Sequence, residues 1–123
     1  RNRVVLSRAN GDHFIARMTI NSQSRRFLVD TGATTTVLTA SGAQSLGFSI
    51  GDLNYSIPTY TANGTAMAAP ARLDTVELGS IRRQDLRVLV AQAGALRENL
   101  LGMNFLNTLS SFEFRGDELY LTD

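Results

Sequence analysis

Apolar and polar side chains alternate over short stretches of the chain, and this pattern predicts a protein built mainly of β-strands. Residues 14–20 alternate with the two-residue period of a strand. The polar residues 21–24 predict a turn, and the apolar residues 27–29 predict the strand that returns from it. Residues 34–38 are rich in β-branched side chains and predict a further strand, and residues 40–46 predict a short helix.

The second part of the chain predicts two more hairpins and a helix. Residues 55–69 are rich in threonine and alanine, and Asn63-Gly64 near their middle is a strong signal for a hairpin turn. The arms of this hairpin lack large apolar side chains, so we expect it to stand away from the core. Residues 73–78 and 86–90 predict the second hairpin, and residues 100–109 carry apolar side chains at helical spacing.

The two halves of the chain resemble each other in the order of their elements. Residues 13–38 and residues 73–106 both read as a hairpin, then a short motif that ends in glycine, then an apolar run. Aligning the halves places Leu100 opposite Asp30, so the second half supplies no matching carboxylate. Residues 112–120 follow as a closing pair of short strands.

The composition is that of a folded globular protein and restricts the available chemistry. The chain has 123 residues, 43% of them hydrophobic and 19% charged, with a formal net charge of +1. This length suits one domain, and the small net charge argues against a nucleic-acid or anionic-membrane surface. With no cysteine, no lysine and one histidine, the chain has no thiol nucleophile, Schiff base or histidine-rich metal site. Chemistry must therefore come from carboxylates, hydroxyls, arginines and backbone groups.

Asp30 stands in the most unusual context of the eleven acidic residues. It follows the apolar residues 27–29 and precedes Thr31 and Gly32. A strand this apolar is buried, so the carboxylate at its end lies at the edge of the core and needs hydrogen-bond donors. As the chain turns, the backbone N–H groups of Thr31, Gly32 and Ala33 can supply them. The other acidic residues read as turn residues, solvated strand positions or element ends.

Residues 27–38, Phe-Leu-Val-Asp-Thr-Gly-Ala-Thr-Thr-Thr-Val-Leu, resemble the active-site segment of the retroviral-type, or retropepsin-like, aspartic proteases. The family's second element is an apolar pair, a glycine and a short helix, and it is similar to Leu100, Leu101, Gly102 and the residues that follow. Residues 55–69 resemble the family's flap hairpin. The resemblance spans residues 14–109 and is greatest to small bacterial members that carry Asp-Thr-Gly-Ala.

The resemblance implies an all-β fold, namely a closed retropepsin-like barrel with a flap hairpin and one or two short helices. It implies that residues 1–123 form a single domain that supplies half of an active site. The expected activity is that of an aspartic endopeptidase that acts on a protein or peptide substrate without a metal or a cofactor. Because one chain carries one such aspartate, the resemblance implies a homodimer in which two Asp30 carboxylates share a proton and activate a water molecule.

The residues around Asp30 have roles implied by the same resemblance. Thr31 is expected to hydrogen-bond across the dimer axis, and Gly32 to let backbone and substrate approach closely. At the next position Ala33 lacks the hydroxyl of pepsin-like enzymes, so the carboxylate pair should keep its proton to a higher pH. We therefore expect activity at mildly acidic pH. The residues expected at the tip of the flap, over the peptide, are Tyr60, Thr61, Ala62, Asn63, Gly64 and Thr65.

The resemblance also implies that the chain ends, residues 1–6 and residues 119–123, interleave between the two subunits. Arg3 and Arg8 on one end, and Asp117 with Glu118 before the other, would form a charged rim there. The sequence begins with arginine, so a preceding anchor is conceivable, and cytoplasm and periplasm both stay open as locations. Within this segment we expect no contact with membrane or nucleic acid.

A second function stays open beside the protease. The same fold would serve as a non-catalytic peptide-binding or interaction domain, because fold alone does not decide function. Retention of Asp30, Thr31 and Gly32 favours the enzyme, since a binding module has no need of a carboxylate at the end of a buried strand.

Overall fold

The chain folds into β-strands with two short α-helices, as the sequence pattern predicts. The structure is a computed structural model that describes residues 2–9, 11–61 and 64–123. The elements, in chain order, are β1 (Arg3–Ser7), β2 (Ile15–Ile20), β3 (Gln23–Val29), β4 (Thr36–Leu38), α1 (Ala40–Ser45), the 3-10 turn η1 (Ile50–Asp52), β5 (Ile57–Thr61), β6 (Gly64–Leu78), β7 (Ile81–Ala91), β8 (Asn99–Leu101), α2 (Met103–Leu106), β9 (Ser111–Arg115) and β10 (Glu118–Thr122). Within the described ranges, no helix is long and apolar enough to cross a membrane.

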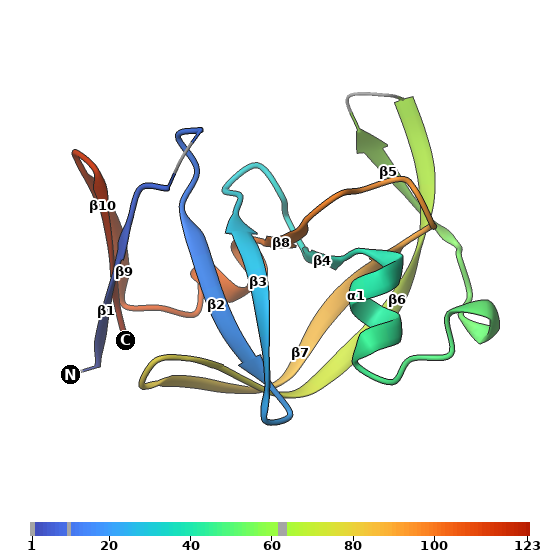
Figure 1. Cartoon of the computed structure of the whole chain (residues 1–123), viewed down its shortest axis with the longest axis horizontal. Helices are drawn as coiled ribbons and strands as arrows, with labels where there is room; N and C mark the ends of the chain where they lie inside the picture. The colour runs from blue at the N-terminus through green and yellow to red at the C-terminus, as the bar shows by residue number, and fades with distance from the viewer. Residues whose placement is uncertain (1, 10, 62–63) are drawn as a thin grey trace.

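Most strands form one sheet that closes on itself into a barrel. Its order is β2-β3-β8-β4-β7-β6-β5, and β2 also pairs with β6, so six strands complete the ring and β5 lies outside it. The closing contact pairs Thr19 with Glu77 and Ile20 with Val76. The β5–β6 hairpin extends away from the barrel at the upper right of Figure 1. The predicted all-β closed barrel is thus confirmed.

The hairpin predicted in residues 14–29 is confirmed, with a tighter turn than expected. Asn21 and Ser22 adopt positive φ angles of 49° and 72°, so a two-residue turn joins β2 to β3. As a result β3 begins at Gln23. The predicted helix in residues 40–46 is also confirmed as α1, where the Thr39 side chain accepts a hydrogen bond from the amide of Gly42.

Two predicted boundaries in the second half were wrong. Residues 73–78 are the end of the long strand β6, which runs without interruption from Gly64 to Leu78. The helix predicted over residues 100–109 is only α2, because Asn99–Leu101 forms strand β8 between β3 and β4. Strand β8 finds parallel partners on β3, at Phe27, Leu28 and Val29, and these long-range pairings override the helical spacing.

The two halves of the barrel meet through parallel strands. Strand β3 runs parallel to β8, with Val29 beside Leu101, and β4 runs parallel to β7. Asp30 and Gly102 therefore leave neighbouring strands at the same level. The two parallel pairs, β3 with β8 and β4 with β7, repeat one arrangement in the two halves of the barrel.

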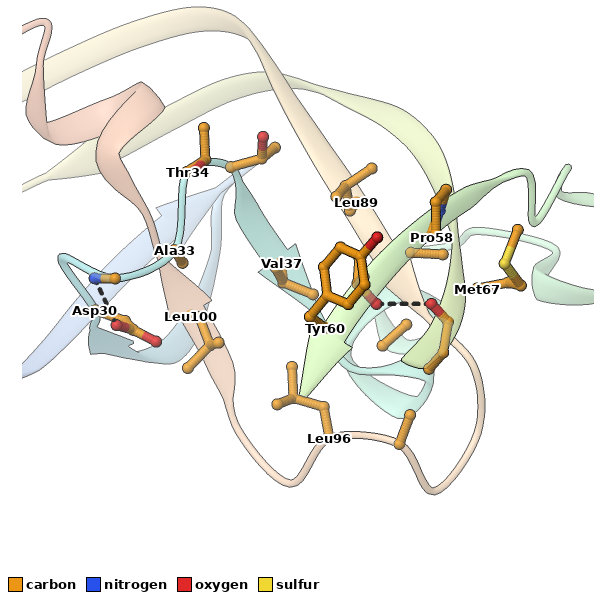
Figure 2. A pocket seen from close by; sticks show the side chains of 17 residues that line it. Asp30, Ala33, Thr34, Val37, Pro58, Tyr60, Met67, Leu89, Leu96 and Leu100 are labelled. Carbon is orange, nitrogen blue, oxygen red and sulfur yellow. Dashed lines mark hydrogen bonds between the residues drawn. The ribbon is translucent and has the colours of Figure 1, made fainter. Parts of the chain in front are cut away.

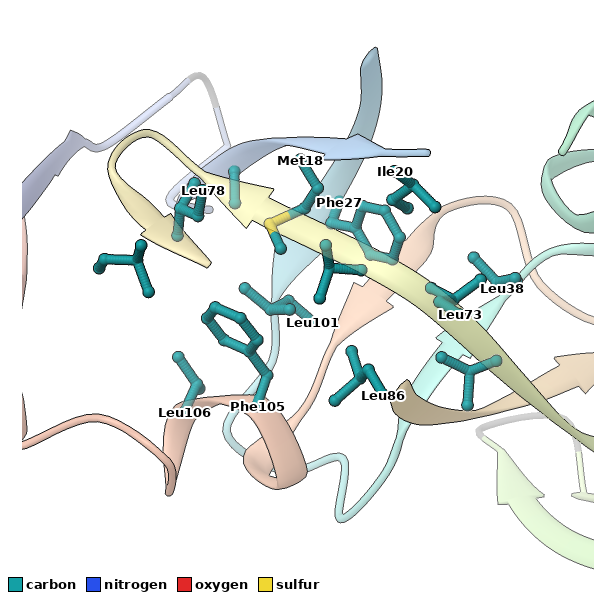
Figure 3. Close-up of a cluster of buried hydrophobic side chains, with 14 of the residues drawn as sticks. Met18, Ile20, Phe27, Leu38, Leu73, Leu78, Leu86, Leu101, Phe105 and Leu106 are labelled. Carbon is teal, nitrogen blue, oxygen red and sulfur yellow. The ribbon is translucent and has the colours of Figure 1, made fainter. Parts of the chain in front are cut away.

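Among the described residues, the barrel encloses one cluster of buried hydrophobic side chains. Phe27, Leu101 and Phe105 are among its largest fully buried members, and they lie together in Figure 3. Phe27 and Leu101 come from the strands that precede Asp30 and Gly102, and Phe105 comes from α2. The packed core thus fixes the strand ends from which the candidate site begins.

A smaller sheet of three strands, in the order β1-β10-β9, pairs the two ends of the chain with each other. Five residues of β1 pair with five of β10, from Arg3 opposite Thr122 to Ser7 opposite Glu118. Arg8 forms an ion pair with Asp117 at 3.3 Å within the same chain. The sequence-based expectation placed the partner of each end on another subunit. Within this chain the two ends pair with each other, since a two-residue turn folds β10 back beside β9 and next to β1.

Candidate active site

Asp30 lies at the end of β3, half-buried, on the wall of a cleft of about 430 Å³. Its backbone amide donates a 3.0 Å hydrogen bond to the carbonyl oxygen of Leu101, which continues the pairing of β3 with β8 by one residue. The strand pairing therefore fixes the backbone from which the carboxylate projects into the cleft (Figure 2). This is the position that the sequence predicts, at the edge of the core.

The chain turns sharply after Asp30 and returns a donor to its carboxylate. The amide of Gly32 donates a 2.9 Å hydrogen bond to Oδ1 of Asp30, and the amide of Ala33 donates a 3.1 Å bond to the Asp30 carbonyl oxygen. Of the three expected backbone donors, Gly32 is therefore the one that reaches the carboxylate. Thr31 and Gly32 are exposed at the tip of the turn.

The start of α2 holds the far side of this turn through backbone hydrogen bonds. The amide of Met103 donates a 2.8 Å bond to the carbonyl oxygen of Ala33, and the amide of Asn104 donates a 3.0 Å bond to that of Thr34. The first amides of a helix have no partner within the helix. Here they donate to the loop that follows Asp30. These hydrogen bonds connect the predicted motif of residues 27–38 directly to the one that begins at Leu100.

Gly102 stands where no side chain fits. A Cβ atom on this residue would lie 2.8 Å from the carbonyl oxygens of Ala33 and Thr35, both of which are backbone atoms. Backbone cannot move aside as the end of a flexible side chain does, so the contact requires glycine. The glycine of the second motif therefore lets the loop of the first motif lie directly against the helix.

Two asparagines complete the support of the site, and the sequence reasoning assigned neither of them a role. Asn104 accepts two hydrogen bonds from Thr36, and its amide group donates a 2.7 Å bond to the carbonyl oxygen of Arg87. Asn99 accepts a 2.9 Å bond from the amide of Thr39 and donates a 3.0 Å bond to the carbonyl oxygen of Arg26. The signal in the sequence was an amide side chain within an apolar run for Asn104 and directly before that run for Asn99, and an amide in such a place calls for polar partners.

Apolar side chains form most of the cleft beyond Asp30. Val37, Leu89 and Leu100 lie between the Asp30 loop and the β5–β6 hairpin, and Pro58 and Tyr60 of that hairpin lie on the side nearer to them, with Met67 farther out (Figure 2). Among the lining residues that the structure describes, Asp30 carries the only charged side chain. Leu101 is buried in the core instead, so of the predicted apolar pair Leu100 alone reaches the cleft.

The β5–β6 hairpin contains the residues predicted at the flap tip. Tyr60 pairs with Thr65, and Thr61 pairs with Gly64, so these four residues form the last rungs of the hairpin ladder. Ala62 and Asn63 lie outside the described residues. Tyr60 lines the cleft, yet 84% of its surface is exposed. An aromatic ring left open to solvent beside a cleft is available to a ligand.

The described part of the chain offers no cluster of three or more histidine, aspartate or glutamate side chains placed to hold a metal ion. The cleft itself offers a single carboxylate among its described lining residues, held by a glycine-containing turn.

Comparison of the chain with known proteins identifies a family and several relatives. Residues 16–108 match the family described as gag-polyprotein putative aspartyl protease. An uncharacterized protein in the cobV 5′ region of Sinorhizobium sp is 40% identical over 120 residues, which are 98% of this chain and 52% of that protein. The uncharacterized protein RP867 of Rickettsia prowazekii (strain Madrid E) is 35% identical over 118 residues, or 96% of this chain and 50% of that protein. The chain thus spans about half the length of these relatives.

Two solved structures have the same fold. The crystal structure of a retropepsin-like aspartic protease from Rickettsia conorii superposes with a TM-score of 0.89 at 33% identity, covering 98% of this chain and 89% of that one. The EIAV protease, complexed with the inhibitor HBY-793, superposes with a TM-score of 0.69 at 22% identity, covering 86% of this chain and 96% of that one. The second likeness is one of fold alone.

Proposed function

Because the chain belongs to the gag-polyprotein aspartyl protease family, we propose that it is an aspartic endopeptidase in which Asp30 is the catalytic residue. The observation that supports this most directly is the cleft itself. A lone carboxylate, fixed by the end of β3 and by the Gly32 amide, lies on the wall of a mostly apolar cleft whose other described lining residues are uncharged. A group so placed suits acid–base chemistry on a neutral peptide bond.

One carboxylate does not complete this chemistry, so we propose that two chains form one active site. In the described chain, Asp30 is the only acidic residue that lines the cleft, and β8, the parallel neighbour of β3, is followed by Gly102 without a carboxylate. A twofold axis near Asp30 would bring a second, identical carboxylate to the site. Residues 1–123 would then be one domain that supplies half of the enzyme.

The two Asp30 carboxyl groups would share one proton, because two carboxyl groups side by side do not both ionise at low cost. The ionised Asp30 takes a proton from a water molecule, whose oxygen attacks the carbonyl carbon of the peptide bond. The protonated Asp30 polarises the carbonyl oxygen, and a proton then passes to the nitrogen as the C–N bond breaks. One water is consumed, and a carboxylic acid and an amine are released.

Residues beside Asp30 take roles that follow from their positions. Exposed Thr31 lies at the tip of the turn, where it would meet the same residue of a second chain across the axis. A substrate peptide would lie along the cleft, covered by the flap residues Tyr60, Thr61, Ala62, Asn63, Gly64 and Thr65. Extended peptides pair with strand edges through their backbone, which suits the β5–β6 hairpin.

The test compares the wild type with Asp30→Asn and with Asp52→Asn as the matched control. Asp52 is exposed in η1 and is not among the residues that line the cleft. Each protein is incubated with a peptide library between pH 4 and pH 7, at concentrations diluted through the micromolar range. We expect cleavage by the wild type and by Asp52→Asn, none by Asp30→Asn, and a specific activity that falls on dilution as dimers dissociate.

Three results would contradict the proposal in different ways. Cleavage that persists in Asp30→Asn would remove the role of that residue. Activity that does not change on dilution, with the protein monomeric by sedimentation, would remove the need for two chains. Peptide binding without cleavage at every pH would favour the non-catalytic binding domain.

A further inference from the structure

The three-stranded sheet at the chain ends has β1 and β9 at its two edges, and we propose that a second copy of the chain docks on β9. In this arrangement β9 of one chain pairs antiparallel with β9 of the other about a twofold axis that passes the Asp30 loops. The two sheets of three strands become one sheet of six. The inference rests on the proposed function, since it concerns how two half-sites come together.

The chain ends are held by contacts within one molecule, and exchange with a partner would compete with these contacts. Beyond the β1–β10 ladder, the amide of Asp123 donates a 2.8 Å hydrogen bond to the carbonyl oxygen of Asn2. The guanidinium of Arg83 binds both carboxylate oxygens of Asp123, at 2.6 and 3.2 Å. An interleaved dimer would first have to break all of these contacts.

Strand β1 is covered along part of its length, and β9 is the more open edge. The chain after β1 bridges to β2, because Arg8 pairs with Phe14, and Val4 lies close against Gly79 of the β6–β7 turn. Strand β9 pairs with β10 alone among the described strands. An open strand edge presents unpaired N–H and C=O groups and readily accepts another strand.

The turn between β9 and β10 determines which backbone groups of β9 point outward. Two residues, Gly116 and Asp117, connect the strands, and Gly116 has a φ angle of +58° as a tight hairpin requires. The residues that flank such a turn, Arg115 and Glu118, form a hydrogen-bonded pair, and bonded pairs then alternate along the ladder. The backbone groups of Phe112 and Phe114 therefore face away from β10, toward a docking strand.

A twofold axis fits this edge because it pairs one strand with its own copy in antiparallel orientation. Phe114 is half exposed, at 50%, although its ring contacts that of Phe14 at 5.4 Å between centroids. A neighbouring β9 would cover its open side. The edge is also linked to the site, since residues 107–110 join β9 to α2 over at most roughly 18 Å. Through Met103 and Asn104, α2 holds the Asp30 loop.

The experiment measures amide hydrogen exchange by NMR across a concentration series from monomer to dimer. We expect the amides of Phe112 and Phe114 to become protected by about tenfold or more as dimers form. The amides of Glu113 and Arg115 face β10 and serve as controls within the same strand, protected at every concentration. Dimers whose Phe112 and Phe114 amides exchange as fast as in the monomer would overturn the inference.

A pair of variants tests the same edge through the dissociation constant. Phe114→Lys places a charge on the edge, and we expect it to raise the dimer Kd by at least about tenfold. Val5→Lys is the control, because Val5 is also exposed (44%) on this sheet but lies on its opposite face and on β1. Equal effects of the two variants would contradict docking through β9.

The outcomes separate this inference from the proposed function. Asp30-dependent cleavage by a dimer without β9 protection would leave the enzyme and remove the interface. A dimer with β9 protection that cleaves no peptide would leave the interface and remove the enzyme.

Discussion

The side-chain oxygen of Asn104 accepts two hydrogen bonds of 2.8 Å from Thr36, one from its amide and one from its hydroxyl. The same hydroxyl accepts a 3.1 Å bond from the amide of Gly102, and Thr36 is fully buried. These polar groups thus connect the start of β4, directly after the Asp30 loop, to the start of α2. Buried polar groups that satisfy each other fix one arrangement of the elements that carry them.

Asn104→Ala should therefore destabilise the fold and reduce activity together. Thr36 would keep two buried donors without the acceptor they share, which costs about 1–3 kcal/mol of unfolding free energy. Urea unfolding of the wild type and the variant measures this loss. Asn107→Ala is the matched control, since Asn107 is exposed after α2, and it should change stability by less than about 0.5 kcal/mol. Equal losses in the two variants would contradict the role of Asn104.

Ala33→Ser should move the acid limb of the pH–activity profile to lower pH. Ala33 lines the cleft beside Asp30 and has no hydroxyl to donate to the carboxylate pair. A serine hydroxyl that donates to the ionised form stabilises that form, so the shared proton leaves at lower pH. The profile is measured as kcat/KM against pH, with Ala93→Ser, an exposed alanine outside the cleft, as the control. A shift to higher pH, or none, would refute the argument.

Tyr60→Ala should weaken substrate binding while leaving the fold unchanged. The ring is 84% exposed, so its removal should alter the unfolding free energy by less than about 0.5 kcal/mol. A peptide in the cleft would cover this ring, and we expect KM to rise several-fold in the variant. Val5→Ala removes another exposed side chain outside the cleft and should leave KM as it is. An unchanged KM in Tyr60→Ala would remove the hairpin from the binding site.

The Arg83–Asp123 ion pair should make stability depend on pH in acid. Hydrogen bonds from the Arg83 guanidinium lower the pKa of Asp123, although its partial desolvation opposes this. Because the folded pKa lies below the unfolded value, the pair stabilises the fold above about pH 4. This contribution is lost as the pH falls through the folded pKa. The melting temperature of Asp123→Asn should thus fall less between pH 5 and pH 2 than that of the wild type. Asp52→Asn should behave like the wild type.

The sequence predicted best those features that depend on neighbours along the chain. A turn after residue 20, a helix in residues 40–46 and a closing pair of strands in residues 112–120 are local features, and each was predicted from its own residues. Asp30 was predicted as the candidate site because it follows an apolar strand and precedes a glycine-containing turn. A carboxylate in this context lies at the edge of the core and needs hydrogen-bond donors. Its place on the cleft wall agrees with that argument.

Features that depend on distant partners were not predicted. Residues Asn99–Leu101 form a strand because they pair with β3 on one side and with β4 on the other. The spacing of the apolar residues does not predict these pairings. Asn99 and Asn104 acquire their roles only when Arg26 and Arg87 present carbonyl oxygens to them. The pairing of the two chain ends is likewise a long-range result, with partners more than a hundred residues apart.

The hydrogen bond from the amide of Asp123 to the carbonyl oxygen of Asn2 holds the two ends of the described chain together. Both ends of the described chain emerge at one place, on the side of the molecule remote from the β5–β6 hairpin (Figure 1). A tether or an additional domain joined at either end would leave the mouth of the groove unobstructed. The same proximity would let a short linker fuse the ends, so that the chain could be cut open elsewhere and still fold.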